Sequence, residues 1–304
     1  MLWLDYINIV PYQDIKKIFP QNIRPASEHQ PMHMNEKEFD QRFQWLYPHL
    51  EETGRQLRVL HRNRNFKIGI KDDGTKVTDA DERLNTFWKS LIQQNFPGET
   101  IVSEEDPDSH LYREQTDPTW YVDPIDGTGK FIDGLKNYFV LISLCQAGKA
   151  VFGILYQPER NIVLYGNNHI RARIYSKPDE YREIHRPMSW RHRMPLIVKG
   201  APPILRNELE SVTHLNVKRT SNASHNIISP LISDNTGYIS FRKTAYWDIS
   251  APAAIMESAG FKTGQFRFGE PAGFNDGYIY CDRFYALPAD TPENVISYIS
   301  TVAT

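Results

Sequence analysis

The sequence predicts an α+β protein, because two amphipathic helical segments precede a series of short strand-like segments joined by tight turns. Apolar residues recur at intervals of three, four or seven over residues 39–60, and a similar spacing returns over residues 84–92. From residue 101 on, short apolar runs follow one another, separated by turn-forming residues. A chain of 304 residues is long enough for two lobes or one large domain.

Balanced charge and ordinary apolar content exclude several classes of protein. The chain has 35 Lys and Arg against 37 Asp and Glu, whereas nucleic-acid and membrane-surface binders need a sustained basic excess. Aromatic residues make up 12% and apolar residues 40%, more than a disordered chain carries. No apolar run approaches the roughly 18 residues of a membrane span, and we expect no export signal. Cys145 and Cys281 stand in no metal or redox spacing, so we expect a cytoplasmic protein with two buried thiols.

The predicted helices begin after an N-terminal extension. Residues 1–33 are rich in Pro, Gln and Asn and lack clean periodicity, so residues 34–304 are predicted to form the folded domain. We expect its N-terminal lobe to end near residue 175 and its C-terminal lobe to begin near residue 176. The first helix contains Pro48, which favours a kink. After a polar turn at residues 71–75, Asp79 and Glu82 indicate the start of a second helix, which stops at Pro97 and Gly98.

The strands are predicted from short apolar runs over residues 101–103, 120–122, 138–146, 150–157, 162–165 and 170–175. The last four are joined by tight turns, which indicates an antiparallel meander. Further on we expect strands at 196–199 and 238–241 and a helix near 226–232. Another helix follows Trp247 and ends at Gly260, and a last one begins at Thr291 and Pro292. The basic segment 160–199 is predicted to be a solvated loop or to face an anionic ligand.

The most informative stretch is an apolar strand that ends in the sequence Asp-Pro-Ile-Asp-Gly-Thr at residues 123–128. Proline after Asp123 holds that residue extended, so Asp126 arrives on a turn that can aim it at the same point. The amides of Gly127 and Thr128 follow where a helix can begin, which is an anion site by geometry and dipole. A phosphate bound by these amides and the neighbouring carboxylates would repel each other unless cations lie between them. The alternative is a local turn in which the carboxylates accept from nearby amides.

Further acids stand at similar ends of strands and helices. Glu104 and Glu105 follow the strand at 101–103, Asp248 opens an apolar helix, and Asp81 lies in the first turn of the second helix. If they converge, each close pair repels by about 4 kcal/mol at an effective dielectric constant near 20, so the cluster needs a divalent metal or must protonate. Oxygen ligands select Mg²⁺ over Zn²⁺. Alone, Asp248 is also typical of a helix N-cap, and Glu105 of a solvated or supporting acid.

Other catalytic motifs do not fit the spacing. No calcium-binding EF-hand loop, nucleotide-binding P-loop or Gly-x-Ser-x-Gly elbow is found in the sequence. Asp79 and Asp81 form an Asp-x-Asp pair, but Glu82 and Arg83 follow it instead of the pattern of a phosphatase that forms an aspartyl phosphate. Water is therefore favoured over a carboxylate as the nucleophile.

Three motifs in order resemble the signatures of the inositol monophosphatase superfamily of Mg²⁺-dependent, lithium-sensitive phosphatases. They are Glu104-Glu105, the sequence at 123–128, and Trp247-Asp248 ahead of a helix of small residues. The resemblance extends over about residues 71–260. It implies a layered α-β-α-β-α sandwich with mainly antiparallel sheets and a site between lobes.

Within that superfamily the chain resembles most closely the 3′(2′),5′-bisphosphate nucleotidases. Phe131-Ile132 after the Asp-Gly-Thr, and a hairpin on residues 148–149 that ends in Tyr-Gln-Pro at 156–158, are similar to theirs. Phe241 stands seven residues before Asp248, where inositol-specific members tend to place an acid that contacts sugar hydroxyls. An aromatic ring does not accept those hydrogen bonds, which disfavours inositol.

Two positions depart from the nucleotidase pattern. Gly129-Lys130 stands where a Lys-Glu pair is typical, and Asn226 falls where a Ser-Leu-Lys run is usual. These departures bear on the substrate more than on the reaction.

The resemblance also implies a role for each site residue. One metal ion is held by Glu104, Asp123 and the carbonyl of Ile125, and a second by Asp123, Asp126 and Asp248. Glu104 and the Thr128 hydroxyl orient the attacking water.

Three further roles follow from the same resemblance. Asp81 supports a third ion or hydrogen-bonds Thr128. The amides of Gly127 and Thr128 cradle the phosphate, and Asp248 also faces the substrate.

The implied activity is that of a Mg²⁺-dependent phosphomonoesterase. It removes the 3′-phosphate of nucleotides of the 3′-phosphoadenosine 5′-phosphate type by metal-activated water. We expect neither binding to a nucleic-acid polymer nor integral membrane association. Two alternatives stay open. One is a phosphatase for inositol phosphate or another small sugar or amino-alcohol phosphate, and the other is a catalytically inactive, metal-binding regulatory homologue.

Overall fold

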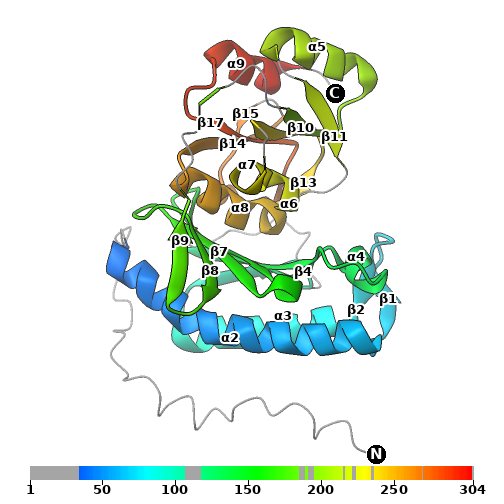
Figure 1. Cartoon of the computed structure of the whole chain (residues 1–304), viewed down its shortest axis with the longest axis vertical. Coiled ribbons are helices and arrows are strands. Elements are labelled where there is room, and N and C mark those ends of the chain that lie inside the picture. Colours follow the sequence, from blue (N-terminus) through cyan, green and yellow to red (C-terminus); the bar gives the residue numbers. More distant parts are fainter. Residues whose placement is uncertain are drawn as a thin grey trace, which may run out of the picture. The chain divides into compact units, whose positions relative to one another are not determined.

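Helices and sheets alternate in layers within the unit that residues 31–304 form (Figure 1). The computed structural model describes residues 34–106, 118–184, 189–190, 195–214, 216–220, 224–233, 236–268 and 270–302. The predicted N-terminal extension, residues 1–33, lies outside the described residues, as do parts of the basic segment 160–199. The predicted division into two lobes near residue 175 stays a prediction.

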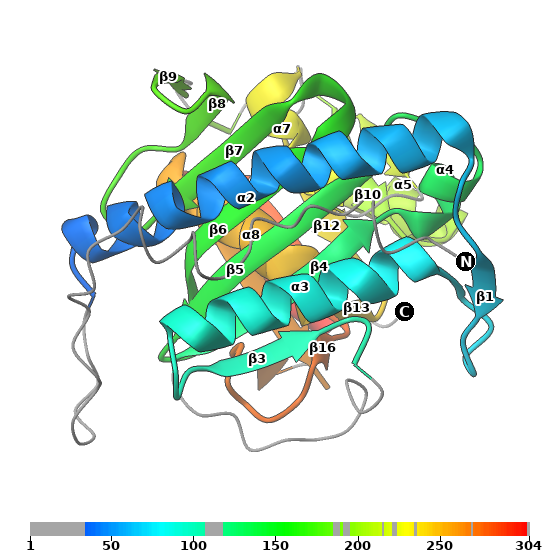
Figure 2. The ribbon, with the colours of Figure 1, turned by 90° about the horizontal axis from the view of Figure 1, so that it is seen from below.

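Two long helices form the first layer and cover one face of a sheet (Figure 2). Helix α2 (Glu36–Asn63) begins with a capping box, in which the Asn35 and Glu38 side chains each accept from the other residue's amide. Helix α3 (Asp79–Asn95) is capped in the same way by Thr78 and Asp81. The predicted apolar positions of α2 are buried except Leu60, which is partly buried, and Pro48 lies inside the helix.

The second layer is a seven-stranded sheet whose order follows the sequence. Its strands are β3 (Thr100–Ser103), β4 (Thr119–Asp126), β5 (Phe139–Gln146), β6 (Lys149–Gln157), β7 (Ile162–Asn167), β8 (Arg173–Lys177) and β9 (Glu180–Glu183). Strands β3 and β4 pair in parallel and all the others are antiparallel, so the predicted meander is confirmed. The strand expected at 170–175 starts later because the Asn167 side chain accepts from the amides of His169 and Ile170 and forms a turn.

Short elements surround the carboxyl ends of β3 and β4. Strands β1 (Ile68–Ile70) and β2 (Lys76–Thr78) form a hairpin around the predicted polar turn at 71–75. Helix α4 (Thr128–Ile132) follows β4 directly, and the 3₁₀ helix η1 (Pro158–Arg160) follows β6.

A six-stranded sheet forms the fourth layer, with the order β11-β10-β12-β17-β14-β15. Its strands are β10 (Leu196–Lys199), β11 (Val217–Thr220), β12 (Gly237–Ser240), β14 (Phe261–Arg267), β15 (Glu270–Pro271) and β17 (Arg283–Pro288). Strand β10 pairs in parallel with β11 and β12, and the remaining pairs are antiparallel. A separate pair joins β13 (Thr244–Ala245) to β16 (Tyr280–Cys281). Helices α5 (Pro203–Thr213) and α9 (Glu293–Thr301) lie on the outer face (Figure 1).

Two predicted helices differ from the structure. The helix expected near 226–232 is two short helices, α6 (Ser224–Ile227) and α7 (Ser229–Ile232). Pro230 has no amide proton for the Asn226 carbonyl, which accepts from the Ser229 hydroxyl instead. In α9 the cap is Pro292 and not Thr291, whose hydroxyl donates to the Pro288 carbonyl.

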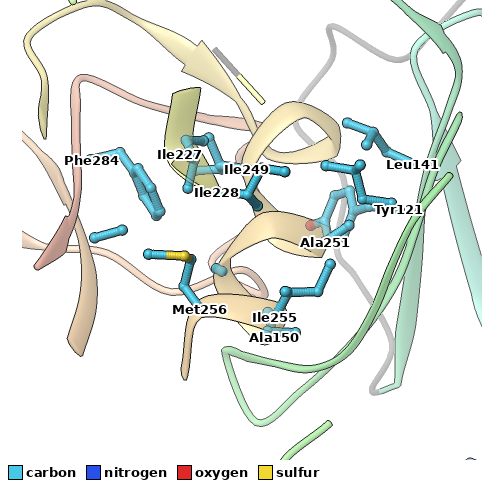
Figure 3. Packing of buried hydrophobic residues seen from close by; sticks show 14 of the residues in the cluster. Tyr121, Leu141, Ala150, Ile227, Ile228, Ile249, Ala251, Ile255, Met256 and Phe284 are labelled. Carbon is cyan, nitrogen blue, oxygen red and sulfur yellow. The ribbon is translucent and has the colours of Figure 1, made fainter. Parts of the chain in front are cut away.

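Helix α8 (Tyr246–Ser258) forms the middle layer and packs between the two sheets (Figure 3). It buries Ile249, Ala251, Ile255 and Met256, and only a few of its residues reach solvent. The helix approaches the seven-stranded sheet closely because Gly153 and Gly166 stand beneath it. The thiols of Cys145 and Cys281 are buried, as predicted, and form no disulfide with each other. Among the described residues, none of the helices is long and apolar enough to span a membrane.

Candidate active site

Three carboxylates from distant parts of the sequence meet at the end of the seven-stranded sheet. Glu104, Asp123 and Asp248 each offer an oxygen, and these oxygens lie within 4.8 Å of one another. The parallel pairing of β3 and β4 brings the first two together, since the Glu104 amide donates to the Val122 carbonyl at 3.1 Å. Asp248 comes from the first turn of α8, which packs against β4 and β5. The N-cap of α8 is Ala245, so the N-cap alternative for Asp248 is wrong.

Asp123 is buried, and a local turn provides a hydrogen bond to only one of its two carboxylate oxygens. One of its oxygens, Oδ1, accepts from the Ile125 amide at 3.0 Å. The other, Oδ2, is buried and has no hydrogen-bond partner among the described residues. A buried carboxylate oxygen without a donor is costly unless a cation contacts it. This oxygen and the all-oxygen donor set around it fit a Mg²⁺ ion.

Repulsion within the cluster shows in the pKa values of its acids. Burial, followed by the charges of Glu104, Asp126 and Asp248, holds the pKa of Asp123 well above its usual range. Burial, followed by Asp126 and Glu104, does the same to the pKa of Asp248. Burial raises the pKa of Glu104 to about 7, against the opposing charge of Lys71. The acids predicted as metal ligands therefore interact electrostatically with one another, and divalent ions stabilise such an arrangement. These four acids are Glu104, Asp123, Asp126 and Asp248.

Thr128 joins this cluster to the start of helix α3. Its hydroxyl oxygen lies 2.9 Å from Asp81 Oδ1 and 3.0 Å from the Ile125 carbonyl oxygen. The hydroxyl has one proton, so at any moment it donates to one of the two. The second oxygen of Asp81 accepts from the amide and the hydroxyl of Thr78, at 2.8 and 2.5 Å. Asp81 is fully buried, and this burial raises its pKa to about 6.

Lys71 is a member of the site that the sequence analysis missed. Its ammonium lies 3.2 Å from the Glu104 carboxylate and 2.8 Å from that of Glu105. The Glu105 side chain is only 5% exposed, so the solvated alternative for this residue is wrong. The sequence signal was weak, since a single lysine in a polar turn is typical of solvated surface. Only the adjacent pair of acids indicated that a cation was needed nearby.

The remaining predicted residues lie at the carboxyl end of β4 and in the second sheet. Gly127 has φ of 89° and is the N-cap of α4, a backbone conformation that favours glycine. Asp126 and Thr128 are half-buried on either side of it. Tyr238 and Phe241 are buried in the core.

The inositol monophosphatase family matches residues 52–285 of the chain, which include every candidate site residue named above. The chain belongs to this family. A curated relative, the 3′(2′),5′-bisphosphate nucleotidase CysQ of Buchnera aphidicola, is 28% identical over 215 residues, which cover 69% of this chain and 79% of that protein. The predicted resemblance is thereby confirmed, and the family and its relatives make this chain a metal-dependent phosphatase of the superfamily.

Solved structures share the fold. An IMPase of Thermotoga maritima superposes with a TM-score of 0.65 at 20% identity, over 85% of this chain and 96% of that one. An IMPase/NADP phosphatase complexed with Mg²⁺ and phosphate gives a TM-score of 0.67 at 14% identity, over 87% of this chain and 97% of that one. The predicted layered α+β fold is confirmed.

Proposed function

We propose that this phosphatase is Mg²⁺-dependent and removes the 3′-phosphate from nucleotides such as 3′-phosphoadenosine 5′-phosphate. The observation that carries the proposal is the convergence of Glu104, Asp123 and Asp248, with a buried Asp123 oxygen that has no donor among the described residues. The nucleotidase relative supports this substrate. In the sequence, Phe241 stands where inositol-specific members of the family tend to place an acid, which also disfavours inositol as the substrate.

Four of the acids and one backbone carbonyl are the expected metal ligands. Glu104, Asp123, Asp126, Asp248 and the carbonyl of Ile125 would hold the metal. When bound, Mg²⁺ lowers the pKa of water and neutralises charge on the leaving oxygen.

The chain itself orients the water. Thr128 donates its only proton to Asp81 or to the Ile125 carbonyl, so its oxygen is left to accept. A water that donates one proton to Thr128 and the other to Glu104 has a lone pair free for in-line attack on phosphorus. Asp81, fixed by two bonds from Thr78, keeps the threonine hydroxyl in that role.

Positive charges surround the acids and favour an anionic substrate. Lys71 and Lys199 both interact with Asp248, and Lys130 interacts with Asp126. The amides of Gly127 and Thr128 would bind the phosphate oxygens where α4 begins. As the sequence resemblance implies, we further expect a small phosphorylated substrate and inhibition by lithium. The two cysteines without metal or redox spacing favour a cytoplasmic location.

A substrate panel tests the proposal. Phosphate release is measured from 3′-phosphoadenosine 5′-phosphate and from inositol 1-phosphate, with Mg²⁺ and with a chelator. We expect turnover of the nucleotide only, and only with Mg²⁺. Turnover of inositol 1-phosphate instead would favour the sugar phosphate alternative, and no turnover on a broad phosphate panel would favour the inactive homologue.

The variant Asp123→Asn is the matched control for the panel. Asparagine keeps an oxygen for the Ile125 amide but loses the charge that holds metal, so the fold stays intact while phosphate release is abolished. Circular dichroism and the thermal midpoint verify the fold. Full activity of this variant would remove Asp123 from the site.

A further inference from the structure

The loop of residues 272–279, which connects β15 to β16, carries an ion pair that takes no part in the reaction proposed above. Its Asp276 pairs with Arg267, the last residue of β14, at 2.5 Å between Asp276 Oδ2 and Arg267 Nη1. The Arg267 side chain is only 6% exposed, and it also donates from Nε and Nη2 to the Tyr280 carbonyl, at 2.9 and 2.6 Å. Because the guanidinium is planar and rigid, a buried arginine with several acceptors holds its neighbours in one arrangement.

This ion pair is attached to Tyr246, the first residue of helix α8. The Tyr246 hydroxyl accepts from Arg267 Nη2 and donates to Asp276 Oδ2 at 3.3 Å. The Tyr246 amide also donates to the Ile279 carbonyl at 2.7 Å. Asp248 follows two residues later, in the first turn of the helix. Arg267 and the 272–279 loop therefore fix the backbone from which Asp248 reaches the acidic cluster.

The same loop is attached to strand β4 through a second tyrosine. The Tyr121 hydroxyl donates to the Phe274 carbonyl at 2.5 Å. Tyr121 stands two residues before Asp123, so both side chains point to the face of the sheet that α8 covers (Figure 3). The rings of Tyr121 and Tyr246 meet edge to face, with a centroid distance of 5.8 Å and an interplanar angle of 90°. The loop thus holds both β4 and α8, in each case two residues before a predicted metal ligand.

These contacts matter for metal binding because the two ligands repel each other. Asp123 and Asp248 offer oxygens within 4.8 Å of each other, so in the absence of metal their charges tend to separate β4 from α8 at this end. Bound metal needs its ligands within about 0.5 Å of their productive positions. A scaffold that keeps the carboxylates in place before the ion arrives raises the affinity, because less ordering remains for the binding step.

We propose that Arg267 and Asp276 are positioning residues that set the affinity of the acidic cluster for Mg²⁺. They act through Tyr246 and the 272–279 loop, which fix the separation between the start of α8 and the end of β4. The inference rests on the proposed function, in which the acids hold Mg²⁺. It assigns part of the metal affinity to this hydrogen-bonded network and not to the ligands alone.

Calorimetric titration of the metal-free protein with Mg²⁺ tests the assignment. Arg267→Gln removes the ion pair and leaves every acid of the cluster in place. We expect it to raise the Kd for Mg²⁺ about tenfold, the lower end of the effect of removing residues that orient metal ligands. At saturating Mg²⁺ its kcat should stay within a few fold of the wild type, because the ligands themselves are unchanged.

The variant Arg42→Gln is the matched control, because it also removes a buried ion pair. Arg42 of α2 donates to both oxygens of Glu99, at 2.9 and 2.6 Å, and its side chain is 10% exposed. Helix α2 covers the opposite face of the seven-stranded sheet from α8. We expect both arginine variants to lower the thermal midpoint, and only Arg267→Gln to weaken Mg²⁺ binding. Equal weakening by both variants, or none by Arg267→Gln, would overturn the assignment.

A milder pair of variants tests the assignment if Arg267→Gln does not fold. Tyr246→Phe keeps the ring against Tyr121 and removes only the hydroxyl, so we expect the Kd for Mg²⁺ to rise about threefold, the effect of one hydrogen bond. Tyr165→Phe is its control, since the Tyr165 hydroxyl accepts from Asn167 at 2.5 Å on β7, three strands away from β4. Equal Kd values for the two phenylalanine variants would overturn the assignment.

The titration separates this inference from the proposed function, because it needs no substrate. If the wild type binds Mg²⁺ but releases no phosphate from 3′-phosphoadenosine 5′-phosphate, the proposed substrate fails, and the Kd values of the variants still decide on the positioning residues. A wild type that binds no Mg²⁺ would overturn both.

Discussion

The Thr128 hydroxyl joins Asp81 to the acidic cluster by a hydrogen bond, and the hydroxyl can be removed while the shape of the side chain is kept. Valine has the same branched side chain but cannot hold a water, so we expect Thr128→Val to lower kcat about 100-fold with little change in KM. Thr128→Ser keeps the hydroxyl and should stay within a few fold of the wild type. Steady-state kinetics on the preferred nucleotide check both variants. If valine were tolerated as well as serine, Thr128 would have no part in orienting water.

At the same scale, site residues that stand in a distinctive local sequence could be predicted. Residues whose role depends on contacts with distant parts of the chain could not. Asp123 could be named because it stands in a rare local pattern, an apolar strand that ends at Asp-Pro. Lys71 could not, because nothing within its turn distinguishes it from a solvated lysine. Its function comes from the approach of the β1–β2 hairpin to Glu104 and Glu105, a tertiary contact over more than 30 positions.

At the scale of elements, helix α8 carries Asp248 into the site, and two glycines set its distance from the sheet. A Cβ on Gly166 would lie 2.8 Å from the Ile255 Cα atom, and one on Gly153 would lie 3.0 Å from the Ala251 Cα atom. Gly166→Ala should therefore push α8 outward, which lowers the free energy of unfolding by about 1–3 kcal/mol. The same displacement should weaken Mg²⁺ binding through Asp248.

Urea denaturation and a Mg²⁺ titration measure the two effects of Gly166→Ala. A Cβ on Gly129 would meet nothing within 4 Å, so Gly129→Ala serves as the control for unfolding. An alanine at 166 that left both the unfolding midpoint and the Mg²⁺ affinity unchanged would show that α8 can adjust without moving the site.

Most helices and strands could be predicted from the sequence, but the interruption of a helix and the order of strands in a sheet could not. Apolar periodicity located α2, α3 and the strands of the meander, where successive strands are neighbours. It merged α6 with α7, because the break depends on a single missing amide at Pro230. The order of the six-stranded sheet was also beyond prediction, since alternation along a strand fixes its faces and not its partners.

At the scale of the whole molecule, the buried acids link stability to pH in the absence of metal. The pKa of Glu104 rises from its ordinary 4.5 to about 7 on folding, and that of Asp81 from 3.8 to about 6. The folded state therefore binds more protons than the unfolded state between these values. Such groups contribute stability below their ordinary pKa, and this contribution is lost as pH rises through the folded pKa. We expect the thermal midpoint in chelator to fall between about pH 5 and about pH 8.

Magnesium should reverse this loss, because an ion that binds only the folded protein stabilises it by mass action. At a free Mg²⁺ concentration of about 100 times its Kd, the gain is about 2.7 kcal/mol. The effect should be larger at about pH 8 than at about pH 5, where protons compete with the ion for the same oxygens. Glu104→Gln should flatten the pH dependence in chelator and reduce the Mg²⁺ effect together, since one carboxylate gives rise to both. A thermal midpoint that rises with pH in chelator, or that ignores Mg²⁺ at high pH, would mean that the four acids are not held close enough to share charge.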